Sequence, residues 1–145
     1  MTSWRDAASA EAQQQLDNLL DVVLPFAQQE LEEHGEFFPY AAAIRADGEP
    51  ELIAGLPAAE GDHPASPDVI DACLAALAER RDRIRAAVVV ADVSTPEGDA
   101  IRAELEHADG HAIAVFLPYS KKRFSRGVDY GELHAEPGRR QVWGG

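Results

Sequence analysis

AAVVVADVSTPEGDAIRAELEHADGHAIAVFL, residues 86–117, decides the fold of this chain. Its first part, residues 86–93, is apolar except for Asp92, a pattern typical of a central strand covered on both faces. A turn-like segment, residues 94–99, separates this run from two further strands, 100–107 and 111–117. The short connection Ala108-Asp109-Gly110 indicates that these two strands form an antiparallel hairpin.

The hydrophobic pattern of this hairpin sets its register. A three-residue loop places the apolar residues of the two strands opposite one another on one face, as Leu105–Ile113, Ala103–Val115 and Ile101–Leu117. A two-residue loop would instead set Glu104 and Glu106 against apolar side chains. We therefore predict the three-residue loop, with both glutamates on the polar face, where glutamates on a strand are usually solvated.

The segments before this stretch predict two helices and a further hairpin. Apolar residues recur at helical spacing from about Ala10 to His34, and Gly35 supplies a stop signal. Residues 37–54 are typical of a hairpin around Ala46-Asp47-Gly48. The pair Ser66-Pro67 suits the start of a second helix, because serine caps the first turn and proline is tolerated there.

The order of elements, α-β-β-α-β-β-β with a possible eighth element, predicts an α+β fold. We expect an antiparallel sheet of about five or six strands with two helices packed against it, and a last strand from about 128 to 134. The length suits one domain, residues 1–145, in which 1–9 and 139–145 are candidate loose termini. Trp143 is nevertheless an aromatic that we expect to dock on the domain.

Charge and composition restrict the classes of partner. The net charge is −13, and residues 1–78 carry fifteen acidic residues against Arg5 and Arg45. This half is either a solvated face or a surface that attracts a basic protein, whereas nucleic-acid binding is disfavoured. No apolar stretch approaches the about 20 residues of a membrane helix, so we expect no membrane partner. The single cysteine, Cys73, and a start without a signal-peptide pattern favour the cytoplasm.

The predicted register creates one candidate metal site. It places His107 opposite His111, with Cβ atoms about 5 Å apart, and two imidazoles at that distance can share an ion. A third ligand would come from Asp109 in the turn or from His134 on the last strand. The alternative is that the two histidines close the end of a hairpin and bind nothing.

A basic and aromatic segment, residues 117–124, stands out in this acidic chain. A docking surface for an acidic or phosphorylated partner would use Tyr119, Lys121, Lys122, Arg123 and Phe124. The same segment could instead neutralise the acidic first half of the chain, or be a solvated loop whose aromatic rings cap the core.

Sequence motifs for catalysis are missing from the chain. Cys73 falls on the buried stripe of the second helix, and no nucleophile elbow, phosphate loop or dinucleotide fingerprint is present. We therefore predict no catalytic residue and no cofactor.

Three stretches resemble a family of small bacterial proteins without an assigned activity: HGEFFPYAAAIRADGE (34–49), ELEHADGHAIAVFLPYSKK (104–122) and VDYGELHAEPG (128–138). The resemblance implies a compact stand-alone domain and carries no activity. The order of elements is also similar to that of roadblock-type and profilin-like modules, which work mainly as dimerising scaffolds.

Our leading expectation is a non-catalytic interaction or regulatory module of a bacterial cytoplasm that binds a protein partner. A small metal-binding protein or hydrolase-type enzyme that uses His107 and His111 is the alternative, and a homodimer built on edge strands is a third.

Overall fold

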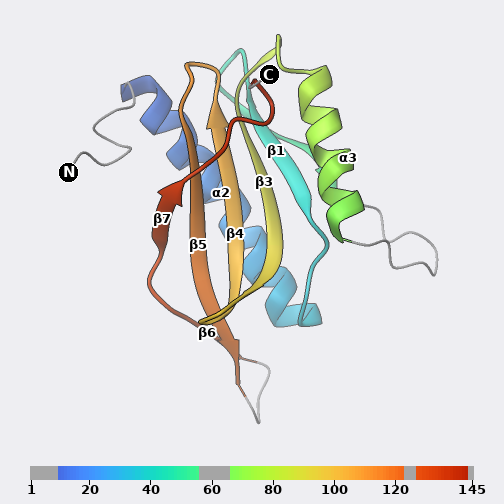
Figure 1. Cartoon of the computed structure of the whole chain (residues 1–145), viewed down its shortest axis with the longest axis vertical. Helices are drawn as coiled ribbons and strands as arrows, with labels where there is room; N and C mark the ends of the chain where they lie inside the picture. The colour runs from blue at the N-terminus through green and yellow to red at the C-terminus, as the bar shows by residue number, and fades with distance from the viewer. Residues whose placement is uncertain (1–9, 56–65, 123–126, 144–145) are drawn as a thin grey trace.

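The computed structural model describes residues 10–55, 66–122 and 127–143. This part of the chain forms two helices and one seven-stranded antiparallel sheet (Figure 1), which confirms the α+β class. The elements are α2 (Ala10–His34), β1 (Tyr40–Arg45), β2 (Pro50–Gly55), α3 (Ser66–Glu79), β3 (Ile84–Thr95), β4 (Gly98–His107), β5 (Ala112–Lys121), β6 (Val128–Tyr130) and β7 (His134–Pro137).

The strands follow the order β2-β1-β3-β4-β5-β6, and β7 also pairs with β5. Between β4 and β5 the three predicted apolar pairs are all present, so the three-residue loop is confirmed. The first hairpin has the same type of turn, in which Arg45 N–H donates to the Glu49 carbonyl at 2.8 Å. Gly48 has a φ of 90°, a conformation that side chains with a Cβ rarely adopt.

The predicted last strand, 128–134, is in fact two short strands that lie end to end along β5. β6 pairs with Tyr119–Lys121, whereas β7 pairs with Ile113–Phe116. Pro118 lies between these two regions of β5 and has no N–H to donate, so the ladder is interrupted there. The prediction missed this break because it considered the last strand without its partner.

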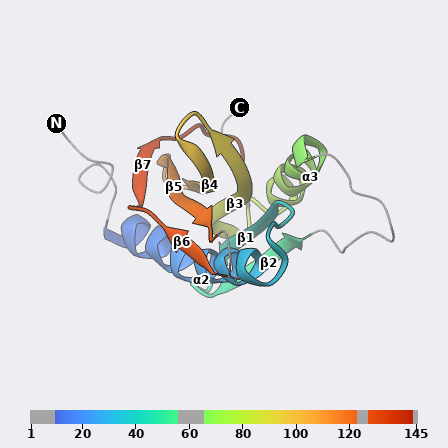
Figure 2. The ribbon, with the colours of Figure 1, turned by 90° about the horizontal axis from the view of Figure 1, so that it is seen from below.

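The two helices cover opposite faces of the sheet (Figure 2), but to different extents. The larger core packs α2 against residues of β1, β3, β4 and β5. The smaller core packs α3 against β1 and β3, together with Val142 from the C-terminal segment. Consequently, on the face of the sheet against which α3 packs, no helix of the described chain lies above β4, β5 and β7.

The expectation of a loose C-terminus is wrong for residues 141–143. Val142 is buried in the smaller core, and Trp143 packs against the same cluster, as expected for an aromatic that docks. The segment crosses β5 so closely that a Cβ on Gly138 would lie 2.7 Å from the backbone nitrogen of Ile113. Only glycine fits this crossing without a shift of the backbone.

Among the described residues, no helix combines the length and the apolar character needed to cross a membrane.

Candidate binding site

The uncovered half of the sheet presents two rows of side chains that face the α3 side. The register places in one cross-strand row Ala91, Arg102, Phe116 and His134. The next row contains Val89, Glu104, Ala114 and Glu136. Val89, in the second row, belongs to the core under α3. Ala91, in the first row, is two residues further along β3 and therefore points to the same face. Both rows thus lie on the face of the sheet that α3 covers in part.

The β3–β4 hairpin turns this half-face into a pocket. Its end curls toward the α3 side and lies over β5, close to β7 (Figures 1 and 2). This pocket is partly open to solvent, and its volume of about 480 Å³ falls in the range of small-ligand pockets. The lining residues come from the hairpin tip and from the two rows: Thr95, Pro96, Glu97, Gly98, Asp99, Ala100, Phe116, Pro118, His134 and Glu136.

The lining of the pocket combines two stacked aromatic rings with acidic side chains. The rings of Phe116 and His134 are stacked, with centroids 5.4 Å apart and planes 12° from parallel. Of the lining residues, those with carboxylates are Glu97, Asp99 and Glu136. An aromatic face beside carboxylates favours a cation, because the ring quadrupole and the carboxylates both attract positive charge.

Arg102 is adjacent to this pocket, one strand away from Phe116. Its side chain is 25% exposed, and its Nε is buried without a hydrogen-bond partner in the part of the chain that the structure describes. The carboxylate oxygen Oε1 of Glu104 lies 3.9 Å from this Nε, beyond hydrogen-bonding distance. An arginine with an unused donor on an open sheet face is a candidate receptor for an anion.

The predicted pairing of His107 with His111 is present, since His107 N–H donates to the His111 carbonyl at 2.8 Å. Both ring nitrogens of His107 are nevertheless used within the protein. Its Nδ1 accepts the backbone N–H of Asp109 at 3.1 Å, so its Nε2–H is the donor to Gln15 Oε1 at 2.6 Å. The side chain is 3% exposed, and burial lowers the pKa of His107 below 6.5.

Asp109 joins the two histidines of this turn. Its Oδ1 lies 2.8 Å from Nδ1 of His111 and 3.3 Å from Nδ1 of His107. Burial alone would raise the pKa of Asp109, but the hydrogen bonds from His111 lower it below its ordinary value. These contacts give the three residues a structural role in closing the hairpin.

His134 does not approach this turn. His134 lies opposite Phe116 of β5. Phe116 is five residues after His111, which corresponds to roughly 16 Å along an extended strand. Among the described residues, the metal-ligating groups with donor atoms within 4.8 Å of one another are Glu30, Glu33 and His34, near the end of α2. Such groups are common on exposed helix surfaces, and we assign them no ion.

The basic and aromatic segment is divided between the core and the surface. Tyr119 is 7% exposed, and its hydroxyl donates to Asp92 Oδ1 at 2.5 Å, so its ring belongs to the core. Burial raises the pKa of Tyr119. Lys121 and Lys122 are exposed, and Lys122 Nζ lies 3.9 Å from an oxygen of Asp129. Arg123 and Phe124 lie outside the described residues.

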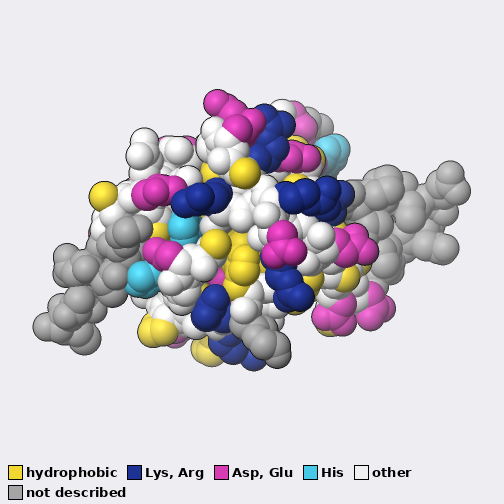
Figure 3. All heavy atoms as spheres, turned by 90° about the horizontal axis from the view of Figure 1, so that it is seen from above, with side chains coloured by type: hydrophobic (Ala, Val, Ile, Leu, Met, Phe, Trp, Pro, Cys, Tyr) yellow, Lys and Arg dark blue, Asp and Glu magenta, His cyan; other side chains and the backbone are white. Residues whose placement is uncertain are grey.

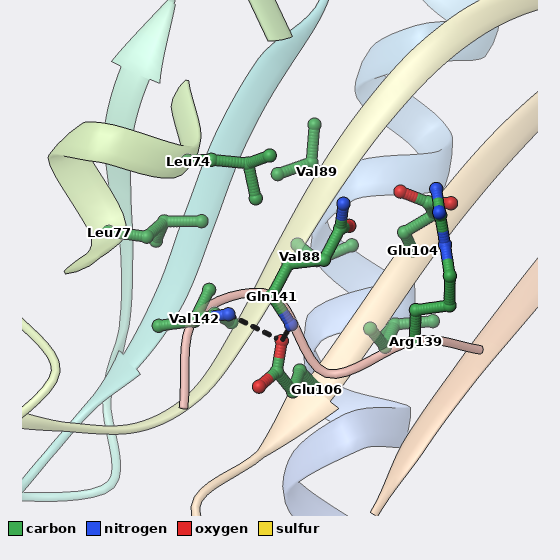
Figure 4. A pocket seen from close by; sticks show the side chains of 11 residues that line it. Leu74, Leu77, Val88, Val89, Glu104, Glu106, Arg139, Gln141 and Val142 are labelled. Carbon is green, nitrogen blue, oxygen red and sulfur yellow. Dashed lines mark hydrogen bonds between the residues drawn. The ribbon is translucent and has the colours of Figure 1, made fainter. Parts of the chain in front are cut away.

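Glu106 is buried, contrary to the expectation of a solvated glutamate, and is 4% exposed. Its carboxylate accepts backbone N–H groups from Gln141, Val142 and Trp143 at 2.7–2.8 Å. Figure 4 shows two of these bonds and the C-terminal segment that they hold over β4. The prediction failed because the donors come from a segment 35 to 37 residues away in sequence.

Positive and negative side chains alternate at the end of the molecule where the hairpin tips meet (Figure 3). Arg45 pairs with Asp47 within the first tip, and Arg85 contacts Glu11 of α2. Arg85 of the second half therefore pairs with Glu11 of the acidic first half, and this end of the molecule carries both signs of charge.

No protein-family model, curated protein or solved structure shows a significant similarity to the chain.

The sequence predictions named His134 but missed Phe116 and Arg102. The predicted register already carried a signal for Phe116, because it placed this large aromatic on the face opposite the three apolar pairs. A large, partly exposed aromatic ring on a polar strand face is a reason to look for a binding surface there. No local signal in the sequence indicated that the β3–β4 hairpin would enclose that face.

Proposed function

We propose that this protein is a non-catalytic interaction module that binds a basic segment of a protein partner. The observation that carries the proposal is the pocket beside β5 and β7, where the stacked rings of Phe116 and His134 lie beside three carboxylates. A lysine or arginine side chain matches this lining, because its apolar stem packs on rings and its charged end binds carboxylates. The net charge of −13 supports the same class of partner. The single cysteine, a free thiol, supports a cytoplasmic setting.

The test is an NMR titration of the isotope-labelled protein with a short peptide that carries one internal arginine and is blocked at both ends. A matched peptide has glutamine in place of arginine. We expect the arginine peptide to bind more tightly and to shift the amide signals of β5, β7 and the β3–β4 tip.

Two variants connect this binding to the pocket. Phe116→Ala removes the ring wall, and Glu136→Gln removes one carboxylate, so each should weaken the arginine peptide several-fold. Glu79→Gln, at the exposed end of α3, changes the net charge as much as Glu136→Gln does and should leave the affinity nearly unchanged. Equal binding of the arginine and glutamine peptides would contradict the proposed function.

A further inference from the structure

We propose that the basic residue recognised by this pocket is the last residue of the partner chain, and that Arg102 binds its terminal carboxylate. This inference rests on the proposed function, since it requires a lysine or arginine side chain in the pocket. It goes further by naming the class of ligand, a peptide that ends in a free basic residue.

The position of Arg102 provides the first support. It shares a cross-strand row with Phe116 and His134, so the arginine, the aromatic ring and the imidazole follow one another across three neighbouring strands. Neighbouring strands are about 5 Å apart, and a lysine or arginine side chain is long enough to cross one such step. The carboxylate of a terminal residue can therefore lie at Arg102 while its stem crosses Phe116 toward the pocket.

The hydrogen-bonding state of Arg102 provides the second support. Its buried Nε has no partner in the part of the chain that the structure describes, and an unsatisfied buried donor costs about 1–3 kcal/mol. A carboxylate is the natural partner, because a guanidinium presents its donors in a fork that matches two carboxylate oxygens. The side chain of Arg102 is a quarter exposed, so part of it is accessible to a ligand on the open face of the sheet.

Glu104, the neighbouring carboxylate, does not saturate Arg102. The separation of 3.9 Å between Arg102 Nε and Glu104 Oε1 is too long for a hydrogen bond. Figure 4 also shows Arg139 of the C-terminal segment extending toward Glu104, and both residues line the small cavity drawn there. A second arginine near Glu104 reduces the repulsion that this carboxylate would exert on an incoming anion.

The experiment uses two peptides that differ only at the carboxyl terminus. Both are acetylated glycine-serine peptides that end in arginine; one ends in a free carboxylate and the other in an amide. Isothermal titration or NMR shift mapping gives their dissociation constants for the wild-type protein, Arg102→Gln and Arg139→Gln. Thermal unfolding verifies that each variant is folded.

We expect the free acid to bind the wild-type protein about tenfold or more tightly than the amide. Arg102→Gln should remove this preference while it keeps the binding of the amide. Arg139→Gln leaves Arg102 in place but no longer offsets the charge of Glu104, so it should reduce the preference only in part. Equal affinities of the acid and the amide for the wild-type protein would overturn the role of Arg102 and leave the proposed function standing. Failure of both peptides to bind would overturn the two proposals together.

Discussion

His107 is a buried imidazole whose surroundings favour the neutral form. Its two ring nitrogens are bonded to Gln15 and to the Asp109 backbone, and its side chain is almost completely buried. The charged groups that act on it are Asp109, Arg85 and Glu11, but burial is the largest influence and lowers the pKa of His107 below 6.5. In the unfolded chain the imidazole regains its ordinary pKa and binds a proton more readily.

This difference predicts that the protein loses stability in mild acid. The unfolded state binds more protons than the folded state below pH about 6.5, so the free energy of unfolding should fall as the pH drops from about 7 to about 5. One such group gives a slope of at most about 1.4 kcal/mol per pH unit. Urea unfolding at a series of pH values measures the slope.

The variant His107→Gln should have a flatter dependence on pH in this window. Gln29→Ala, which changes an exposed residue of α2 without a titratable group, should keep the wild-type slope. The same slope in all three proteins would show that His107 does not titrate on unfolding.

At the scale of elements, the C-terminal segment is anchored by hydrogen bonds from β4 and from the end of α3. Glu106 accepts three backbone N–H groups, and Arg81 donates to the Val142 carbonyl at 3.3 Å from the end of α3. Glu106→Gln removes the charge and turns one acceptor oxygen into a donor that faces an N–H group. We therefore expect the free energy of unfolding to fall by about 1–3 kcal/mol.

Hydrogen exchange of the amides of residues 141–143 measures the local effect of this change. These amides should lose protection in Glu106→Gln before the strands of the sheet do. Glu79→Gln is the matched control, because it makes the same change at an exposed position of α3 that takes no part in the bonds to Gln141, Val142 and Trp143. Unchanged protection in Glu106→Gln would contradict the anchoring role.

The elements also show what the sequence could and could not predict. The register of β4 and β5 was predictable because alternation of apolar residues permits only one register that buries them, and Leu105 opposite Ile113 confirms it. The division of the last strand at Pro118 and the capture of the C-terminal segment by Glu106 were not predictable, since both depend on partners distant in sequence. The pocket depends on the curl of the β3–β4 hairpin over β5, a long-range arrangement for which the sequence of the hairpin carries no local signal.

For the whole molecule, the net charge of −13 attracts the basic partner that we propose before the two molecules touch. Long-range attraction raises the rate of association and is screened by salt, whereas contacts in the pocket mainly set the rate of dissociation. The two contributions can therefore be separated by kinetics, provided that one variant alters the distant charge and another alters the pocket.

We expect the association rate of the arginine peptide to fall as salt is raised from about 0.02 M to about 0.2 M, because the Debye length shortens over this range. The double variant Glu30→Gln/Glu33→Gln on α2 should lower the association rate and leave the dissociation rate unchanged, since neither residue lines the pocket. Glu136→Gln should mainly raise the dissociation rate. Stopped-flow fluorescence with a labelled peptide measures both rates. If the α2 variant instead raised the dissociation rate as much as Glu136→Gln did, the peptide would be bound on the helical face and the pocket would not be its site.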